Sequence, residues 1–150
     1  MPNSSPVDTW ERLVRFHRVA TASMDERLRE RFGHSLDDYD VLHQIAAHGE
    51  PIRMGELAAR LLVANSSCNR IVGRLAAAEL VERTRGAHDR REVFVDLTAE
   101  GQRLRRRMAA VHVRDIQRLL DTPLSTSQLA LLDSALRDLL AGAEAAPDIT

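Results

Sequence analysis

Between residues 65 and 78, apolar side chains recur every three or four positions, and this spacing predicts a short amphipathic helix. The buried face of this helix would carry Cys68, Ile71, Val72 and Leu75. Small and polar residues occupy the opposite face, namely Ser66, Arg70, Gly73 and Ala77, flanked by Ser67, Asn69 and Arg74. A helix without bulky outward side chains can lie deep in a DNA major groove, where serine, asparagine and arginine bind base edges or phosphates.

The segments on either side of this helix predict another short helix and a β-hairpin. Upstream, the run GELAARL predicts a helix that buries Leu57, Ala58, Leu61 and Leu62. Downstream, residues 81–85 and 92–97 read as two short strands, and Gly86 supplies the turn between them. The connection places Arg90 and Arg91 at the projecting end, where an arginine suits the narrow, electronegative minor groove. Two short helices followed by a hairpin predict a winged helix-turn-helix.

A long helix is predicted at the N-terminus, over residues 8–32. It begins with a capping box formed by Asp8 and Glu11 and ends at Gly33. Its apolar line comprises Trp10, Leu13, His17, Ala20 and Met24. This three-four spacing is typical of a seam against another helix.

Capping boxes also mark the starts of two further helices. Ser35-x-x-Asp38 opens the helix that precedes the GELAARL run, and that helix closes at Gly49. Ser125-x-x-Gln128 opens the last helix, which is expected to end at Gly142. Its apolar line comprises Leu129, Leu132, Leu136 and Leu139.

The helix after the hairpin is predicted from residue 99 to about residue 120, with Thr98 as its cap. Its inner line comprises Leu104, Met108, Val111, Ile116 and Leu119. The apolar stripes at both ends of the chain exceed what the winged helix-turn-helix, residues 36–98, can cover. Residues 8–32 and 99–141 are therefore predicted dimerisation helices of a twofold homodimer. The predicted fold class is mostly α with a small β-hairpin wing.

The run LVERTRGAHDRREVFVDLTAEG, downstream of ELAARL and NRIVGRL, resembles the MarR family of bacterial transcription regulators. The resemblance extends over residues 8–141, and the family's Asp-x-Arg wing signature falls on Asp89 and Arg91. It implies that Arg91 enters the minor groove while Asp89 orients it or a neighbouring arginine. Two positions depart from the family pattern. Glu79 stands where glycine is usual, so the helix end needs another geometry or tolerates strain, and Ala64 stands where a serine cap is common.

Length and charge are consistent with this reading. A chain of 150 residues is expected to form a single domain, residues 1–150, and its net charge of −1 does not by itself indicate a nucleic-acid partner. All of its 21 basic residues are arginine, and ten of them fall between residues 65 and 107. No apolar run approaches the ~20 residues that span a bilayer, and the first residues lack a signal pattern. We expect a cytoplasmic protein.

The sequence and the resemblance together predict a ligand-responsive, sequence-specific regulator, a repressor, that binds inverted-repeat operators in double-stranded DNA as a homodimer. The candidate DNA-binding residues are Ser66, Ser67, Asn69, Arg70, Arg74, Asp89, Arg90 and Arg91. The resemblance implies a small aromatic or phenolic effector, held at the junction between the dimer helices and the winged part. The candidate effector-binding residues are Trp10, His17, Asp40, His43 and His112.

Several residues also permit other interpretations. Cys68 can be a small apolar residue of the core. It can also be a redox switch, since a thiol near a helix N-terminus can have a lowered pKa. No histidines show the spacing that chelates a metal on one helix face, and no Gly-x-Ser-x-Gly elbow surrounds Ser66 or Ser67. We therefore expect no metal, no cofactor and no enzyme activity. The alternative function is a winged-helix protein-interaction module without specific DNA binding.

Overall fold

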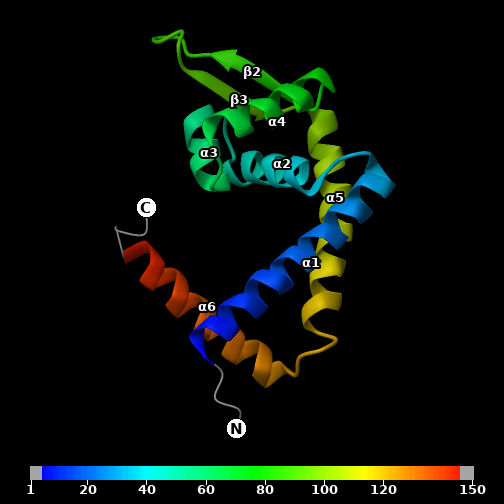
Figure 1. Cartoon of the computed structure of the whole chain (residues 1–150). Coiled ribbons are helices and arrows are strands. Elements are labelled where there is room, and N and C mark those ends of the chain that lie inside the picture. The colour runs from blue at the N-terminus through cyan, green and yellow to red at the C-terminus, as the bar shows by residue number, and fades with distance from the viewer. Residues whose placement is uncertain (1–4, 146–150) are drawn as a thin grey trace. The chain divides into compact units, whose positions relative to one another are not determined.

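Six helices and a three-stranded antiparallel sheet form the part of the chain that the computed structural model describes, residues 5–145 (Figure 1). In chain order the elements are α1 (Pro6–Phe32), α2 (Leu36–His48), β1 (Ile52–Arg53), α3 (Met54–Leu61), α4 (Asn65–Ala77), β2 (Val81–Arg85), β3 (Val93–Leu97), α5 (Ala99–Leu120) and α6 (Thr126–Ala145). The mostly helical fold with a small sheet confirms the predicted fold class. The chain divides into two compact units, one up to residue 112 and one from residue 113 onward.

The core of the first unit lies where α2, α3 and α4 pack against β3 and the start of α5. Fully buried side chains come from every one of these elements, namely Leu42, Ile45, Leu57, Val72, Leu75, Val95 and Met108. The buried face of α4 consists of Cys68, Ile71, Val72 and Leu75, as the three-four spacing predicts. The opposite face of α4 is therefore turned toward solvent.

Helix α2 has the predicted boundaries because both of its ends are satisfied locally. Ser35 Oγ accepts the Asp38 N–H, and the Asp38 carboxylate accepts the Ser35 N–H, so the capping box is complete. Gly49 ends the helix in the left-handed region at φ 83°, which glycine adopts without a Cβ clash.

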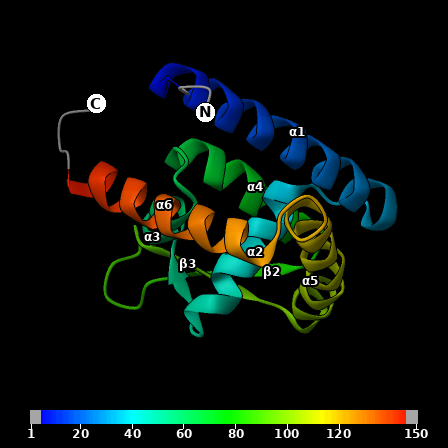
Figure 2. The same cartoon turned by 90° about the horizontal axis from the view of Figure 1, so that it is seen from below.

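The N-terminal helix starts earlier than predicted. Ser5, not Asp8, is the cap, because Ser5 Oγ accepts the Asp8 N–H at 3.1 Å and Pro6 fits the first helical position. Only the C-terminal half of α1 is covered in this chain, where Ala20, Met24 and Leu28 are buried. The predicted seam is open at its other end, since Trp10 is 65% exposed. Figures 1 and 2 show this N-terminal half extending away from α2.

The end of α3 corrects one prediction about the core. Leu57 and Ala58 are buried as expected, and Leu61 packs at the edge of the core. Leu62 is 92% exposed rather than buried. It is the C-cap of α3 in the left-handed conformation at φ 55°, so its side chain leaves the helical stripe on which the prediction placed it.

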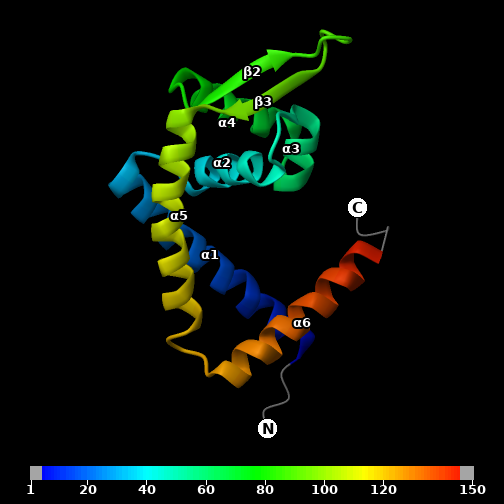
Figure 3. The same cartoon turned by 180° about the vertical axis from the view of Figure 1, so that it is seen from behind.

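The sheet contains one strand that sequence patterning missed. Its order is β1-β3-β2, and the hairpin strands β2 and β3 match the predicted segments closely. Strand β1 has only two residues, too few for an alternation to be visible, yet Ile52 is fully buried opposite Val95. The hairpin continues past β1 and projects beyond the helices (Figures 1 and 3).

The joint between α4 and α5 is built by close backbone contacts. Glu79, at the position where the family resemblance leads us to expect glycine, itself adopts the left-handed conformation, at φ 59°. Thr98 donates its N–H to Leu80 O at 3.1 Å and its hydroxyl to Glu79 O at 2.7 Å. The same hydroxyl caps α5 by accepting the Gly101 N–H at 3.0 Å, as predicted. A Cβ on Gly101 would lie 1.9 Å from Leu80 O, so this contact requires glycine.

The second unit comprises the end of α5 and helix α6. The Ser125 and Gln128 capping box is present, with bonds of 2.9 and 3.3 Å. Helix α6 continues to Ala145 and does not end at Gly142, because a helix interior tolerates glycine at about 1 kcal/mol. None of the residues of α6 is buried in this chain.

The inner line of α5 also differs from the prediction. Ile116 is exposed and Asp115 is buried. Position 115 follows Val111 by four residues and stays on the buried stripe, whereas position 116 is rotated by roughly 100°. Within residues 5–145, every helix is too short or too polar to cross a membrane.

Candidate nucleic-acid interface

The outer face of α4 presents its small and polar residues to solvent. Ser66, Asn69 and Arg70 are exposed, and Ser67 is half-buried. Ala64 occupies the N-cap position and has no side chain that can accept a hydrogen bond, so the first turn of α4 has no side-chain cap. Such a helix end carries N–H groups that favour an anion such as a phosphate.

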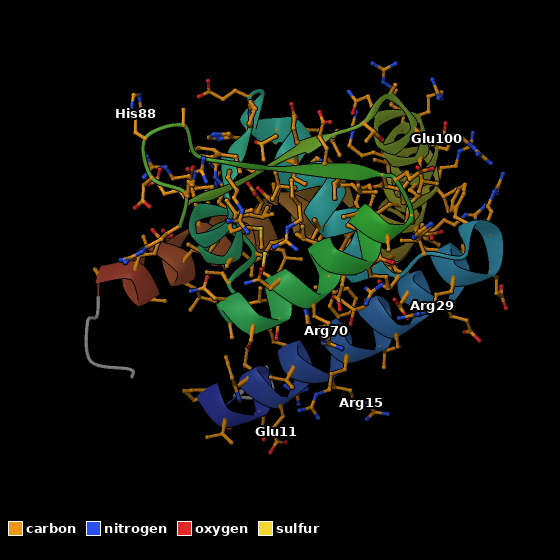
Figure 4. The ribbon with its side chains drawn as sticks, turned by 90° about the horizontal axis from the view of Figure 1, so that it is seen from above. Glu11, Arg15, Arg29, Arg70, His88 and Glu100 are labelled. Carbon is orange, nitrogen blue, oxygen red and sulfur yellow. The ribbon has the colours of Figure 1, made fainter. Side chains whose placement is uncertain are left out.

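Arg70 extends outward from α4 (Figure 4). With Ser67, Asp37 and Asp40 it lines a hollow of about 210 Å³. Burial raises the pKa of Asp40; nearby His112 and His43 lower it, and Asp37 adds to the rise. The structure therefore brings together Arg70, a predicted DNA-binding residue, and Asp40, a predicted effector-binding residue.

Arg74 is engaged within the protein. Its guanidinium donates to Asp38 Oδ1 at 2.5 Å and so ties α4 to the start of α2. Asp38 also accepts the Ser35 N–H at 3.0 Å and contacts His34 Nδ1 at 3.3 Å. Burial raises the pKa of Asp38, but the bonds from Arg74, Ser35 and His34 outweigh it and hold the pKa below its ordinary value. Arg74 thus fixes the position of the helix, and its predicted contact with DNA stays a prediction.

Asn69 is held from two sides. Its Oδ1 accepts a hydrogen bond from Arg83 Nη2 at 3.1 Å, and its Nδ2 donates to Asn65 O at 3.1 Å. Arg83 belongs to β2, so this contact joins the wing to α4. Sequence reasoning missed Arg83, although its position two residues after the buried Val81 places it on the inner face of the strand.

The wing tip is ordered by Asp89. Its carboxylate accepts the Arg91 N–H at 2.8 Å, and its carbonyl accepts the Glu92 N–H at 3.1 Å. Gly86 closes the turn by donating to Glu92 O at 3.0 Å, and a Cβ there would lie 2.6 Å from Asp89 O. Arg90 and Arg91 are exposed, and within residues 5–145 neither forms an ion pair. Figure 4 shows this loop, marked by His88, at the outer edge of the domain.

A groove lies between the wing, the start of α3 and one side chain of α4. It has a volume of about 330 Å³ and is lined by residues that include Arg53, Glu56, Asn69 and Arg91. Arg53 pairs with Glu92 at 2.9 Å and lies over the Phe94 ring. Arg53 was also missed, because the strand that carries it is too short to recognise.

Three of the five candidate effector-binding residues come together around one aromatic ring. The centroid of the Tyr39 ring lies 5.7 Å from that of His43 and 4.8 Å from that of His112. Both histidines also lower the pKa of the neighbouring Asp40, against the effect of burial. Trp10 and His17 lie instead on the exposed half of α1. There Trp10 borders a separate, open hollow of about 430 Å³ with Glu11 and Arg15, both labelled in Figure 4.

Cys68 occupies a core position. The thiol is fully buried, and burial raises its pKa, while the charge of Arg83 acts in the opposite direction. These features support the interpretation of Cys68 as a core residue and not as a reactive thiolate. Among residues 5–145 no three histidine, cysteine or acidic side chains are placed to hold a metal ion.

Comparisons with known proteins agree on one family. A sequence model of the MarR family matches residues 32–92. The structure of AbsC, a MarR family transcriptional regulator from Streptomyces coelicolor, matches with a TM-score of 0.82 and 26% identity, over 95% of this chain and 97% of that one. Sco3205, a MarR family regulator from the same organism in complex with DNA, matches with a TM-score of 0.80 and 26% identity, over 89% and 84% of the two chains.

The fold is also similar to that of a mutant MarR from E. coli complexed with operator DNA. That match has a TM-score of 0.79 and 23% identity and covers 93% of this chain and 99% of that one. No curated protein sequence matches this chain significantly. The matched family consists of transcriptional regulators and not of enzymes, in agreement with the expectation from the sequence. Residues 32–92 thus match the MarR family, and the chain as a whole has the fold of MarR family winged-helix transcriptional regulators.

Proposed function

We propose that this protein binds double-stranded DNA sequence-specifically, with α4 in the major groove and the wing tip in the adjacent minor groove. The observation that carries the proposal is the slim, polar outer face of α4 beside a wing tip whose Asp89 orders the backbone of Arg91. Ser66, Ser67, Asn69 and Arg70 would contact bases or phosphates. The structures of two similar proteins, Sco3205 and a mutant of E. coli MarR, were determined in complex with DNA, which supports DNA binding by this protein.

The protein would act as a homodimer. Large apolar side chains remain exposed at both ends of the chain, among them Trp10, Phe16 and Val19 on α1 and Leu139 and Leu140 on α6. Burial in a second copy would remove this surface from water at about 25 cal/mol per Å². A twofold dimer would place its two α4 helices about 34 Å apart, so the operator would be an inverted repeat.

The regulator would respond to a small aromatic or phenolic effector and act as a repressor in the cytoplasm, where its DNA lies. The support is a cluster in which exposed His43 and half-buried His112 pack on the buried Tyr39 ring, with the Asp40 carboxylate beside them. A solved relative, PcaV from Streptomyces coelicolor, was determined with its natural ligand. A ligand that binds one spacing of the two α4 helices more tightly would shift the dimer toward that spacing and change its affinity for DNA.

Selection of bound sequences from random DNA tests the proposal. The wild-type protein should enrich mirrored half-sites about one helical turn apart. Arg91→Ala should weaken binding to the selected site at least tenfold and reduce the slope of log affinity against log salt, by about one unit if a phosphate contact is lost. Arg137→Ala, on α6, should do neither. Failure to enrich any sequence at low salt would refute DNA recognition and favour the protein-interaction module.

A further inference from the structure

The side chain of Asn69 has a fixed orientation although it is exposed on the outer face of α4. A carboxamide has one acceptor end and one donor end, and both are engaged here. The oxygen faces the Arg83 guanidinium at 3.1 Å, and the nitrogen faces the Asn65 carbonyl at 3.1 Å. A rotation by 180° would set donor against donor and acceptor against acceptor, so it would lose both hydrogen bonds.

Arg83 can impose this orientation because the sheet holds it in place. It lies on β2 directly opposite Val95, which is fully buried, so its side chain extends from the inner face of the hairpin toward α4. The strand is paired on either side of this point, at Val81 with Leu97 and at Arg85 with Val93. The backbone that carries the guanidinium is therefore held by the wing and not by the helix that carries Asn69.

The orientation decides what Asn69 can pair with. One N–H of its Nδ2 and one lone pair of its Oδ1 are not used by these two contacts, and asparagine uses this pair of groups to bind the N7 and N6 edge of adenine. An amide of fixed orientation offers donor and acceptor in only one order along the groove. An amide free to rotate offers both orders and discriminates less.

We propose that Arg83 is a positioning residue for base readout: by holding the Asn69 amide from the wing, it sets the base preference of the helix at one position in each half-site. This inference rests on the proposed function, because it concerns how bound DNA is read. Arg83 acts through Asn69 and is not required to touch a base itself.

Selections of bound DNA with wild type, Asn69→Ala, Arg83→Ala and Arg85→Ala test the proposal. Arg85 is the matched control, since it has the same charge on the same strand, two residues closer to the tip, and lacks an ion pair within residues 5–145. Asn69→Ala should identify the mirrored position that loses its preference. At that position alone, Arg83→Ala should lower the preferred-to-next base ratio at least about fivefold, the low end of what one good base contact provides.

Arg85→Ala should keep the wild-type preference at every position and change only the overall affinity. Should Arg83→Ala likewise reduce affinity for all sequences evenly, Arg83 would be a phosphate anchor and the proposal would be wrong. An Asn69→Ala selection identical to wild type would also overturn it. Arg83→Met keeps the apolar stem without the donor and replaces Arg83→Ala if the latter unfolds. Failure of the wild type to select any sequence would instead refute the proposed function itself.

Discussion

Replacing Gly101 by alanine should destabilise the protein, although alanine is the better helix former. Three atoms of the Leu80 backbone surround the place where the new Cβ would lie, the nearest being Leu80 O at 1.9 Å. Ordinary contact requires the two segments to separate by at least about 1 Å. Leu80 O also accepts the Thr98 N–H at 3.1 Å, so this movement strains the hydrogen bond that joins α4 to the start of α5.

The opposing effects can be compared in magnitude. Overpacking costs about 1–3 kcal/mol, and loss of the Leu80–Thr98 hydrogen bond adds about 1 kcal/mol. The higher helix propensity of alanine returns about 1 kcal/mol. The net loss is therefore about 1–3 kcal/mol, and the melting temperature should fall by roughly 3–10 °C.

Thermal unfolding followed by circular dichroism measures the change. Gly73→Ala is the matched control in the same unit of the structure, because nothing lies within 4 Å of its Cβ position and the same substitution should raise stability there by about 0.5–1 kcal/mol. If Gly101→Ala melted at or above the wild-type temperature while Gly73→Ala gained as expected, the close approach to Leu80 would not be rigid and the reasoning would fail.

Three further predictions concern single side chains. Glu79→Gly should stabilise the protein by about 0.5–1 kcal/mol in urea unfolding. The left-handed conformation costs a non-glycine residue about 1–2 kcal/mol, and the greater chain entropy of unfolded glycine cancels part of the gain. A less stable variant would contradict this. Asp38 and Asp25 have pKa values held below their unfolded values, burial being outweighed by bonds from Arg74 and Arg29 respectively, so their stabilisation is present above about pH 4 and is lost as the pH falls through the folded pKa values. Urea unfolding between pH 6 and pH 3 should show this fall, and it should be shallower in Asp38→Asn. Cys68 should react with iodoacetamide at pH 8 only as fast as the protein unfolds, because burial raises its pKa and shields it; rapid labelling of the native protein would revive the redox interpretation.

Local patterns were enough to predict the winged helix-turn-helix from the sequence. The boundaries of α2 follow from a capping box and a terminal glycine, and the buried face of α4 follows from the spacing of Cys68, Ile71 and Leu75. The hairpin follows from the alternation of Val93, Val95 and Leu97 with mostly polar neighbours in its second strand and from the turn at Gly86. Each of these signals lies within a few neighbouring residues, where geometry is nearly independent of the rest of the fold.

The contacts that position the interface could not be predicted, because they join residues far apart in the chain. Arg74 and Asp38 are 36 positions apart, and Arg83 and Asn69 are 14 positions apart. The sequence around Arg74 does not show whether this arginine binds a phosphate or holds one helix against another. The exposure of Leu62 depended on a left-handed cap formed by a residue other than glycine, which composition does not reveal.

The shortness of β1 has a mechanical consequence for the hairpin. Strand β3 is flanked on both sides only at Val95 and Phe94, and beyond Phe94 the hairpin is a two-stranded ribbon. A two-stranded ribbon twists and bends more readily than a three-stranded sheet. We expect bending to concentrate just past Phe94, so that Arg91 can follow minor grooves of unequal width while Arg83, paired opposite Val95, stays fixed. The wing tip would thus adapt to the shape of the duplex, while the base preference of α4 would stay the same.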